Sequence, residues 1–189
     1  ASRGVRAYAV DRSPGVLAYL RQVAPEVAAV AGDLRDFQLP EPVEVVFCPL
    51  GTMAYLIGDE EWQRSLAAVA RALLPGGVMV LEFVPGDAHK TEALSWTMLR
   101  DGLTVEATAG PLHSDQPGVY AWEMHLRLRS SSGERHYRGV QVQREVTAAL
   151  AERLVRATGE FGRIELFGDW DVRHRWRGDP TVVLVASRR

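Results

Sequence analysis

Two short apolar segments that each end in a carboxylate constrain the fold of this chain most strongly. Residues 27–31 are followed by Gly32-Asp33, and residues 6–10 are followed by Asp11. A run of small and β-branched apolar residues has no polar face to show water, so each segment is predicted to be a buried strand of a parallel sheet. Ligands of open α/β sheets bind outside the carboxyl ends of the strands. Both carboxylates are therefore expected beside a ligand site.

The segments that follow continue the alternation of strands and helices. They predict, in order, a helix capped by Ser13 and opened by Pro14, a strand at 43–48, a helix capped by Asp59 that ends at Leu74-Pro-Gly-Gly77, and a strand at 78–84. This order is typical of an α/β protein with a doubly wound parallel sheet.

The middle third of the chain has a different periodicity. Between Leu103 and Val142 apolar and polar residues alternate, as in the segment 120–129, and Ser130-Ser-Ser-Gly133 is suited to a hairpin turn. We therefore predict an antiparallel insertion, 103–142, lying over the parallel sheet within a single domain, 1–189. A helix from Thr147 to Gly159 and strands at 162–167 and 181–186 complete the predicted order.

Charge and cysteine content limit the classes of partner. The formal net charge is −2, so no broad basic surface favours nucleic acid or an anionic membrane, and a small molecule is the expected partner. The single cysteine, Cys48, excludes an internal disulfide and suits a reducing cytoplasm, where it is interpreted as a buried thiol. No apolar run approaches the ~20 residues that cross a bilayer. A homodimer is compatible with this composition.

The segments in this order resemble a class I S-adenosylmethionine (SAM)-dependent methyltransferase. The motifs that carry the resemblance are Tyr8-Ala-Val-Asp11, Ala31-Gly-Asp-Leu-Arg-Asp-Phe37, Val45-Val-Phe-Cys48 with Gly51-Thr-Met-Ala-Tyr-Leu56, and Leu74-Pro-Gly-Gly77. The second motif, the Tyr-Leu pair and the insertion resemble the small-molecule group that includes amino-sugar N-methyltransferases. The resemblance implies a Rossmann-like fold, SAM as cofactor, no metal, and methyl transfer to N or O of a small-molecule acceptor.

The resemblance also implies roles for individual residues. Asp11 would accept hydrogen bonds from the ribose hydroxyls and Asp33 from the adenine amino group, while Leu34 would cover the base. Alternatively, Asp11 caps the following helix and Asp33 forms a turn. The cofactor-binding candidates are Asp11, Arg12, Gly32, Asp33, Leu34, Cys48, Pro49 and Leu50, and the substrate-contact candidates are Thr52, Tyr55 and Phe83.

Methyl transfer from a sulfonium is an in-line displacement that depends mainly on alignment. An acceptor that carries a proton also needs a base, and a histidine side chain changes charge near neutral pH. The candidates are His113 and His125, because the insertion is expected to roof the active site, and Glu82, because it ends a strand at the same edge. The alternative for each histidine is an exposed strand or loop residue.

One departure from the family pattern concerns the beginning of the chain. No Gly-x-Gly loop precedes Asp11, and only ten residues do. In the family's strand order, the strand before that loop lies between the strands that end at Asp11 and Cys48. We therefore expect the chain to be N-terminally incomplete, with an upstream segment of about 30 or more residues in the natural protein, as a βαβ unit requires.

Other functions remain open at this stage. One is a catalytically inactive methyltransferase-like binding or scaffold subunit. A second is a nicotinamide-dependent oxidoreductase, which Gly32-Asp33 at the second strand disfavours. The alternating Arg173, Arg175 and Arg177 are compatible with a grip on phosphate, carboxylate or nucleic acid, or with a solvated loop.

Overall fold

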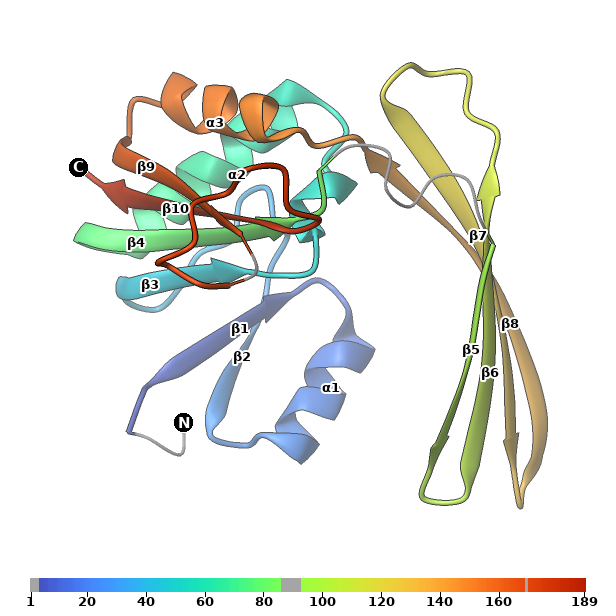
Figure 1. Cartoon of the computed structure of the whole chain (residues 1–189). Coiled ribbons are helices and arrows are strands. Elements are labelled where there is room, and N and C mark those ends of the chain that lie inside the picture. Colours follow the sequence, from blue (N-terminus) through green and yellow to red (C-terminus); the bar gives the residue numbers. More distant parts are fainter. Residues whose placement is uncertain (1–3, 86–92, 169) are drawn as a thin grey trace.

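A computed structural model describes residues 4–85, 93–168 and 170–189 of the chain (Figure 1). In this part of the chain, three α-helices and one 3₁₀ helix accompany three separate sheets. The elements are β1 (Ala7–Asp11), α1 (Pro14–Val23), β2 (Val27–Ala31), β3 (Val43–Cys48), η1 (Thr52–Tyr55), α2 (Asp59–Ala72), β4 (Leu73–Phe83), β5 (Leu94–Arg100), β6 (Leu103–Leu112), β7 (Val119–Ser130), β8 (Gly133–Arg144), α3 (Ala148–Ala157), β9 (Phe161–Gly168) and β10 (Val182–Arg188).

The N-terminal unit is the predicted strand–helix–strand repeat. Strands β1 and β2 pair in parallel, and α1 connects them. As predicted, Ser13 caps the helix by accepting a hydrogen bond from the Val16 amide at 3.4 Å, and Pro14 is its first residue. The Gly32 amide donates to the Asp11 carbonyl at 3.1 Å, so the two strand ends that carry the carboxylates are joined directly.

The central sheet has the strand order β3-β4-β10-β9. Strand β3 runs parallel to β4, whereas β10 is antiparallel to both β4 and β9. Helices α2 and α3 pack against this sheet and against each other. The core between them is mainly apolar: Trp62, Leu66 and Leu184 have no exposed surface. The Trp62 indole keeps its N–H satisfied by donating to the Leu56 carbonyl at 3.1 Å.

Two predicted boundaries of α2 are wrong. The helix ends at Ala72, and Leu73 already pairs with β3, so residues 74–77 bulge out of β4 between the partners Val43↔Leu73 and Val45↔Val78. Asp59 is the first helical residue rather than the cap. The cap position is held by Gly58, whose amide donates to the Glu61 carboxylate at 3.1 Å, because the Glu61 side chain folds back over the helix end.

The α/β body has the predicted Rossmann-like order of elements, and its strands are divided between two sheets, β1–β2 and β3–β4–β10–β9. Within the described residues, no strand pairs with both β1 and β3. Strand β3 therefore lies at an edge of its sheet. Val45 and Phe47 on that strand are more than half exposed, although their sequence pattern predicts burial.

The antiparallel insertion is larger than predicted and lies beside the α/β body. It comprises β5, β6, β7 and β8 in sequence order, from Leu94 to Arg144, and is called the insertion sheet below. The predicted hairpin at Ser130–Gly133 is confirmed. The sequence does not predict strand β5, whose residues are all exposed and which is defined by its pairing with β6. Figure 1 shows the sheet beside the α/β body rather than over it.

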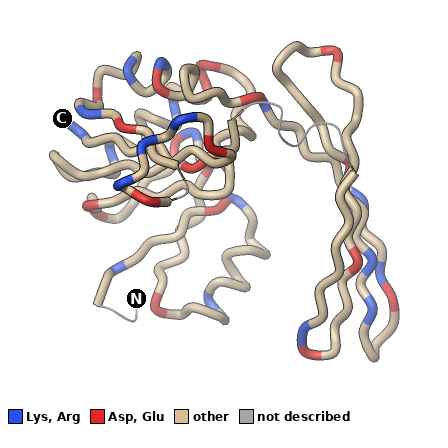
Figure 2. The backbone as a smooth tube through the Cα atoms, in the orientation of Figure 1, with Lys and Arg blue, Asp and Glu red and all other residues tan. Residues whose placement is uncertain are grey.

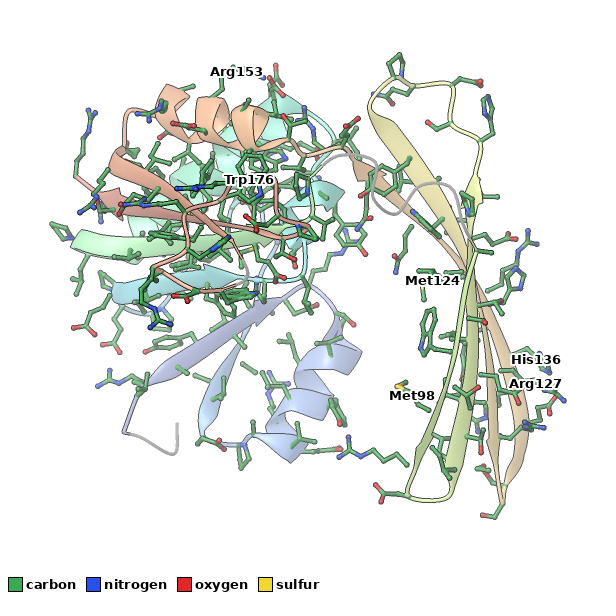
Figure 3. The ribbon with its side chains drawn as sticks, in the orientation of Figure 1. Met98, Met124, Arg127, His136, Arg153 and Trp176 are labelled. Atoms are coloured by element: carbon green, nitrogen blue, oxygen red, sulfur yellow. The ribbon has the colours of Figure 1, made fainter. Side chains whose placement is uncertain are left out.

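The two faces of the insertion sheet differ in chemistry. Met98 and Met124 point toward the α/β body, whereas Arg127 and His136 point away from it (Figure 3). The outer face carries ion pairs between Arg127 and Glu134 at 3.0 Å and between Arg129 and Glu106. Figure 2 shows basic and acidic residues interspersed along this part of the sheet. The inner face is thus the apolar one.

The last segments are close to prediction. Thr147 caps α3 by accepting from the Leu150 amide at 3.1 Å, and Gly159 follows the helix with φ +71°. Strands β9 and β10 then pair antiparallel. No helix in the described ranges is both long and apolar enough to cross a membrane.

Candidate functional site

The first group of predicted residues lies at the carboxyl ends of β1 and β2. Asp11 is half-buried, and its Oδ1 accepts a hydrogen bond from the Ser13 amide at 2.7 Å, which ties the carboxylate to the start of α1. Gly32 leaves little room for a side chain, because a Cβ there would lie in tight contact, 3.1 Å from both Phe37 Cβ and Val10 Cγ1. Glycine therefore allows the loop after β2 to pass close against β1.

Asp33 is held by a residue that the sequence analysis did not single out. Arg35 donates from Nε to Asp33 Oδ1 at 2.8 Å and from Nη2 to Oδ2 at 2.6 Å, and its backbone amide donates to Oδ1 at 2.9 Å. These hydrogen bonds hold the pKa of Asp33 well below its usual range. Arg35 also contacts Glu61 Oε1 at 3.1 Å, so it links this loop to the start of α2.

Two further cofactor candidates flank this loop. Arg12 lies close enough to Asp33 for its positive charge to help lower the pKa of that carboxyl. Leu34 is half-buried and packs against the hydrophobic core. The structure therefore brings together Asp11, Arg12, Gly32, Asp33 and Leu34 at the joined ends of β1 and β2.

The second group follows β3. Cys48 is buried, as interpreted from the sequence, and burial raises the pKa of its thiol to about 11. Thr52 donates from its hydroxyl to the Pro49 carbonyl at 2.7 Å and opens η1. Tyr55, at the end of η1, is 45% exposed. The Tyr55 side chain is therefore accessible to a substrate.

A pocket of about 280 Å³ lies where the end of β4 meets the insertion sheet. Its volume is close to the lower limit for small-molecule sites. The central sheet and η1 supply one wall, and β7 and β8 supply the other. The lining residues are Leu50, Gly51, Ala54, Glu82, Phe83, Val84, Tyr120, Gln143, Arg144 and Val146. Three predicted site residues, Leu50, Glu82 and Phe83, are therefore brought together here.

Sequence analysis missed the insertion-sheet residues of this pocket. Tyr120 and Gln143 are direct cross-strand partners, and they share the inner face with Trp122 and Met124 because side chains alternate along a strand. Arg144 is only 14% exposed and pairs with Asp59 at 2.9 Å. No local pattern distinguishes these residues from other polar strand residues, because only the closure of the insertion against η1 makes them pocket residues.

The two histidine candidates lie away from this pocket. His113 is in the connection between β6 and β7, pairs with Asp115 at 2.9 Å and is 87% exposed. His125 is on β7, pairs with Glu123 at 2.9 Å and lines a different hollow on the insertion sheet. The structure does not bring either histidine together with Glu82.

The arginine-rich segment after β9 is an ion-paired loop. Arg173 pairs with Asp171 at 3.0 Å, and Arg175 pairs with Glu165 and lies over the Phe167 ring at 4.7 Å. Both guanidinium groups are thus engaged within the chain. This arrangement agrees with the interpretation as a solvated loop.

Comparisons of the sequence with known proteins also point to a methyltransferase. Residues 1–77 match the family described as a methyltransferase domain. The chain is 30% identical over 139 residues to a dTDP-3-amino-3,4,6-trideoxy-alpha-D-glucopyranose N,N-dimethyltransferase of Streptomyces venezuelae, which covers 70% of this chain and 56% of the relative. It is 42% identical over 67 residues to a dTDP-4-amino-2,3,4,6-tetradeoxy-D-glucose N,N-dimethyltransferase of Saccharopolyspora spinosa, covering 33% of this chain and 27% of the relative. The chain thus spans little more than half the length of the first of these relatives.

Solved structures with the same fold include two with a TM-score of 0.79. DesVI of Streptomyces venezuelae is 23% identical, and the superposition covers 96% of this chain and 74% of DesVI. The sugar N-methyltransferase KedS8 from Streptoalloteichus sp. ATCC 53650 is 23% identical, with 97% of this chain and 71% of KedS8 covered. Fold, strand-end carboxylates and sequence matches agree: residues 1–77 match a methyltransferase domain, and the chain has the Rossmann-like fold of the class I S-adenosylmethionine-dependent methyltransferases.

Proposed function

We propose that this protein is a SAM-dependent methyltransferase that methylates the amino nitrogen of a small-molecule acceptor, with a nucleotide-linked amino sugar as the acceptor class. The observation that carries the proposal is the similarity to two N,N-dimethyltransferases whose names specify dTDP-linked amino sugars. The pocket at the end of β4 supports it, because its wall combines an apolar side with Glu82, Gln143 and Arg144.

The residues at the ends of β1 and β2 fit the cofactor chemically. Asp11 supplies a carboxylate for the ribose hydroxyls, Asp33 one for the adenine amino group, and Leu34 an apolar surface for the base. Gly32 allows close approach at the same edge. Arg12, Cys48 and Pro49 complete the proposed set along the adjoining loops, and Leu50, the remaining candidate, lines the pocket described next. When bound, the cofactor supplies an electrophilic methyl group, and the protein contributes binding and alignment.

The acceptor is proposed to occupy the pocket between β4 and the insertion sheet. Gln143 offers both hydrogen-bond donors and acceptors, and Arg144 offers guanidinium donors, which are groups that sugar hydroxyls and phosphates bind. Phe83 is buried and lines the pocket together with Leu50, whereas Thr52 and Tyr55 belong to η1 and are not among the lining residues. Removal of the acceptor's proton is assigned to Glu82, His113 or His125 only as a prediction.

The decisive experiment is a binding titration with SAM followed by a turnover assay, using the protein as its gene encodes it. The assay provides a dTDP-linked amino sugar as acceptor and detects the added methyl groups by mass spectrometry. The matched control is a dTDP-sugar with a hydroxyl in place of the amino group, which is expected to remain unmethylated. Binding of SAM without methylation of any amino acceptor would favour the inactive subunit instead.

Cytoplasmic location and homodimer formation stay predictions of the sequence. Gel filtration with light scattering tests the second, because a homodimer doubles the mass of the single chain. Both are independent of the proposed chemistry.

A further inference from the structure

The connection between β3 and η1 contains two consecutive residues in the left-handed region. Leu50 has φ +58° and Gly51 has φ +64°. Glycine adopts this conformation freely, but a leucine there is strained because its Cβ approaches the backbone too closely. A strained residue of this kind persists only where neighbouring groups hold it, and such residues concentrate at functional sites.

Glu82 provides the groups that hold this turn. The Leu50 amide donates to Glu82 Oε2 at 2.6 Å, and the Gly51 amide donates to the Glu82 carbonyl at 3.2 Å. Two successive amides of the turn are thus bound by one residue, once through its side chain and once through its backbone. The first bond has an ionised acceptor, which makes it one of the stronger hydrogen bonds in proteins.

The turn gives Leu50 an unusual position. Its side chain is 84% exposed, although leucine is normally buried, and the residue lines the pocket proposed for the acceptor. Residues 51–54 continue directly into η1, where the Ala54 amide donates to the Gly51 carbonyl at 2.8 Å. The strain at Leu50 therefore places an apolar side chain at the pocket instead of in the core.

We infer that Glu82 is a positioning residue that holds the Leu50–Gly51 turn in its left-handed conformation, so that Leu50 presents an apolar contact to the acceptor. This inference rests on the proposed function for the identity of the ligand. It gives Glu82 a different role from the general base that the sequence suggested. A general base must be able to take up a proton from the methyl acceptor. A residue that only holds the turn, called a clamp below, needs just an oxygen that accepts a hydrogen bond from the Leu50 amide.

The variants Glu82→Gln and Glu82→Ala separate the two roles. The amide oxygen of glutamine still accepts the Leu50 hydrogen bond but cannot act as a base at neutral pH. For a clamp we expect Glu82→Gln to retain most of the kcat/KM that Glu82→Ala loses and to leave the shape of the pH–rate profile unchanged. Glu82→Ala is expected to lower kcat/KM about ten-fold or more, mostly through the acceptor KM, because one charge-assisted hydrogen bond is lost.

A Leu50→Gly background tests whether Glu82 acts through Leu50. Glycine adopts the required φ without strain, so Glu82→Ala is expected to have less than half of its effect, on a logarithmic scale, when Leu50 is already glycine. Equal damage by Glu82→Gln and Glu82→Ala would overturn the inference in favour of a base. An equal effect of Glu82→Ala in both backgrounds, or no effect at all, would overturn it as well.

A readout without turnover separates this inference from the proposed function. Amide hydrogen exchange at Leu50 and Gly51, followed by NMR, is expected to be slow in the parent and in Glu82→Gln and at least about ten-fold faster in Glu82→Ala. If the parent protein neither binds SAM nor methylates an acceptor, the proposed function fails, but this exchange pattern still decides the clamp. Unchanged exchange in Glu82→Ala would refute it.

Discussion

At the scale of single residues, Asp33 shows how a sequence motif can be located correctly while its neighbours are overlooked. The sequence placed Asp33 at a strand end, and the structure has it there. What the sequence did not reveal is that both carboxylate oxygens are engaged by Arg35, two residues later. An aspartate and an arginine at this spacing are common in loops, and only the backbone conformation after β2 decides whether they meet.

We expect this ion pair to make stability depend on pH in a defined direction. The pKa of Asp33 is lower in the folded state than in the unfolded state. The contribution of the Asp33 carboxylate to the free energy of unfolding is therefore present above the unfolded-state pKa of about 3.9 and is lost as the pH falls through the folded-state pKa. Asp33→Asn is expected to lower the free energy of unfolding by about 0.5–1 kcal/mol at neutral pH, a small effect because both partners are about one-third exposed. Urea unfolding at pH 7 and in strong acid measures it.

The control for this prediction is Asp36→Asn. Asp36 makes one ion pair, with Arg64 at 3.0 Å, and its side chain is 60% exposed. We expect its replacement to change stability by less than about 0.5 kcal/mol. The prediction about Asp33 would be wrong if Asp33→Asn and the parent differed as much in strong acid as at pH 7.

Cys48 allows a second test at this scale. Burial raises the pKa of its thiol from 9.0 to about 11. The folded state favours the neutral thiol. The resulting contribution of Cys48 to the free energy of unfolding, on the order of 2 kcal/mol, is present below pH 9 and is lost between about pH 9 and 11. An alkylating reagent at pH 8 is expected to modify Cys48 only after denaturation. Rapid labelling of the native protein, or an alkaline stability loss that persists in Cys48→Ala, would contradict this.

At the scale of elements, the bulge at the start of β4 was correctly predicted as a turn, but the turn was assigned to the end of α2 instead of to β4. The sequence predicted that 74–77 end the helix, because proline and two glycines cannot continue it. The structure confirms the turn, but the chain has already joined the sheet at Leu73. Local propensity identifies the break in regular structure, whereas the hydrogen bonds of Leu73 are fixed by pairing with β3.

The two glycines of this bulge are expected to respond differently to replacement by alanine. A Cβ on Gly77 would lie 2.8 Å from the Leu74 carbonyl oxygen and 3.0 Å from that of Glu44, so the backbone must move. Gly76 has open space but a φ of +76°. We expect Gly77→Ala to lower the free energy of unfolding by about 2–3 kcal/mol and Gly76→Ala by about 1 kcal/mol. Denaturant unfolding measures both, and the reverse order would refute the argument.

The insertion sheet marks another limit of sequence analysis for elements. Alternation of apolar and polar residues correctly predicted β7, where Trp122, Met124 and Leu126 share one face, and the predicted insertion 103–142 covers β6 and most of β8. The same alternation occurs in β5, where Leu94, Trp96 and Met98 share a face, but the strand is short and wholly exposed. Its assignment depends on pairing with β6, which periodicity alone does not reveal.

At the scale of the whole molecule, the sequence predicted the order of elements far better than their assembly into sheets. Each strand of the α/β body was found, because apolar runs with glycine or carboxylate ends are local signals. The division into two sheets, and the position of the insertion beside the body, depend on hydrogen bonds and packing between distant segments. The pocket between β4, η1 and the insertion sheet is for this reason the part of the site that the sequence could not define.

This assembly leads to a prediction about how the two halves of the site interact. Asp11 belongs to the two-stranded sheet and is not among the residues that line the pocket, whereas Gln143 belongs to the insertion sheet and lines it. Asp11→Ala is expected to weaken SAM binding by about 1.5–3 kcal/mol, the scale of a hydrogen bond to a charged group. Gln143→Ala is expected to leave SAM binding unchanged and to raise the acceptor KM by the equivalent of about 1 kcal/mol.

The double variant tests whether the halves act independently. Because the two residues lie in different sheets, their effects on kcat/KM are expected to add within about 0.5 kcal/mol. Steady-state kinetics of the parent, both single variants and the double variant form the cycle, and calorimetric titration with SAM separates loss of cofactor from loss of acceptor. A coupling above about 1 kcal/mol would show that the insertion sheet and the β1–β2 unit move or bind as one element, and the assignment of cofactor and acceptor to separate halves would then be wrong.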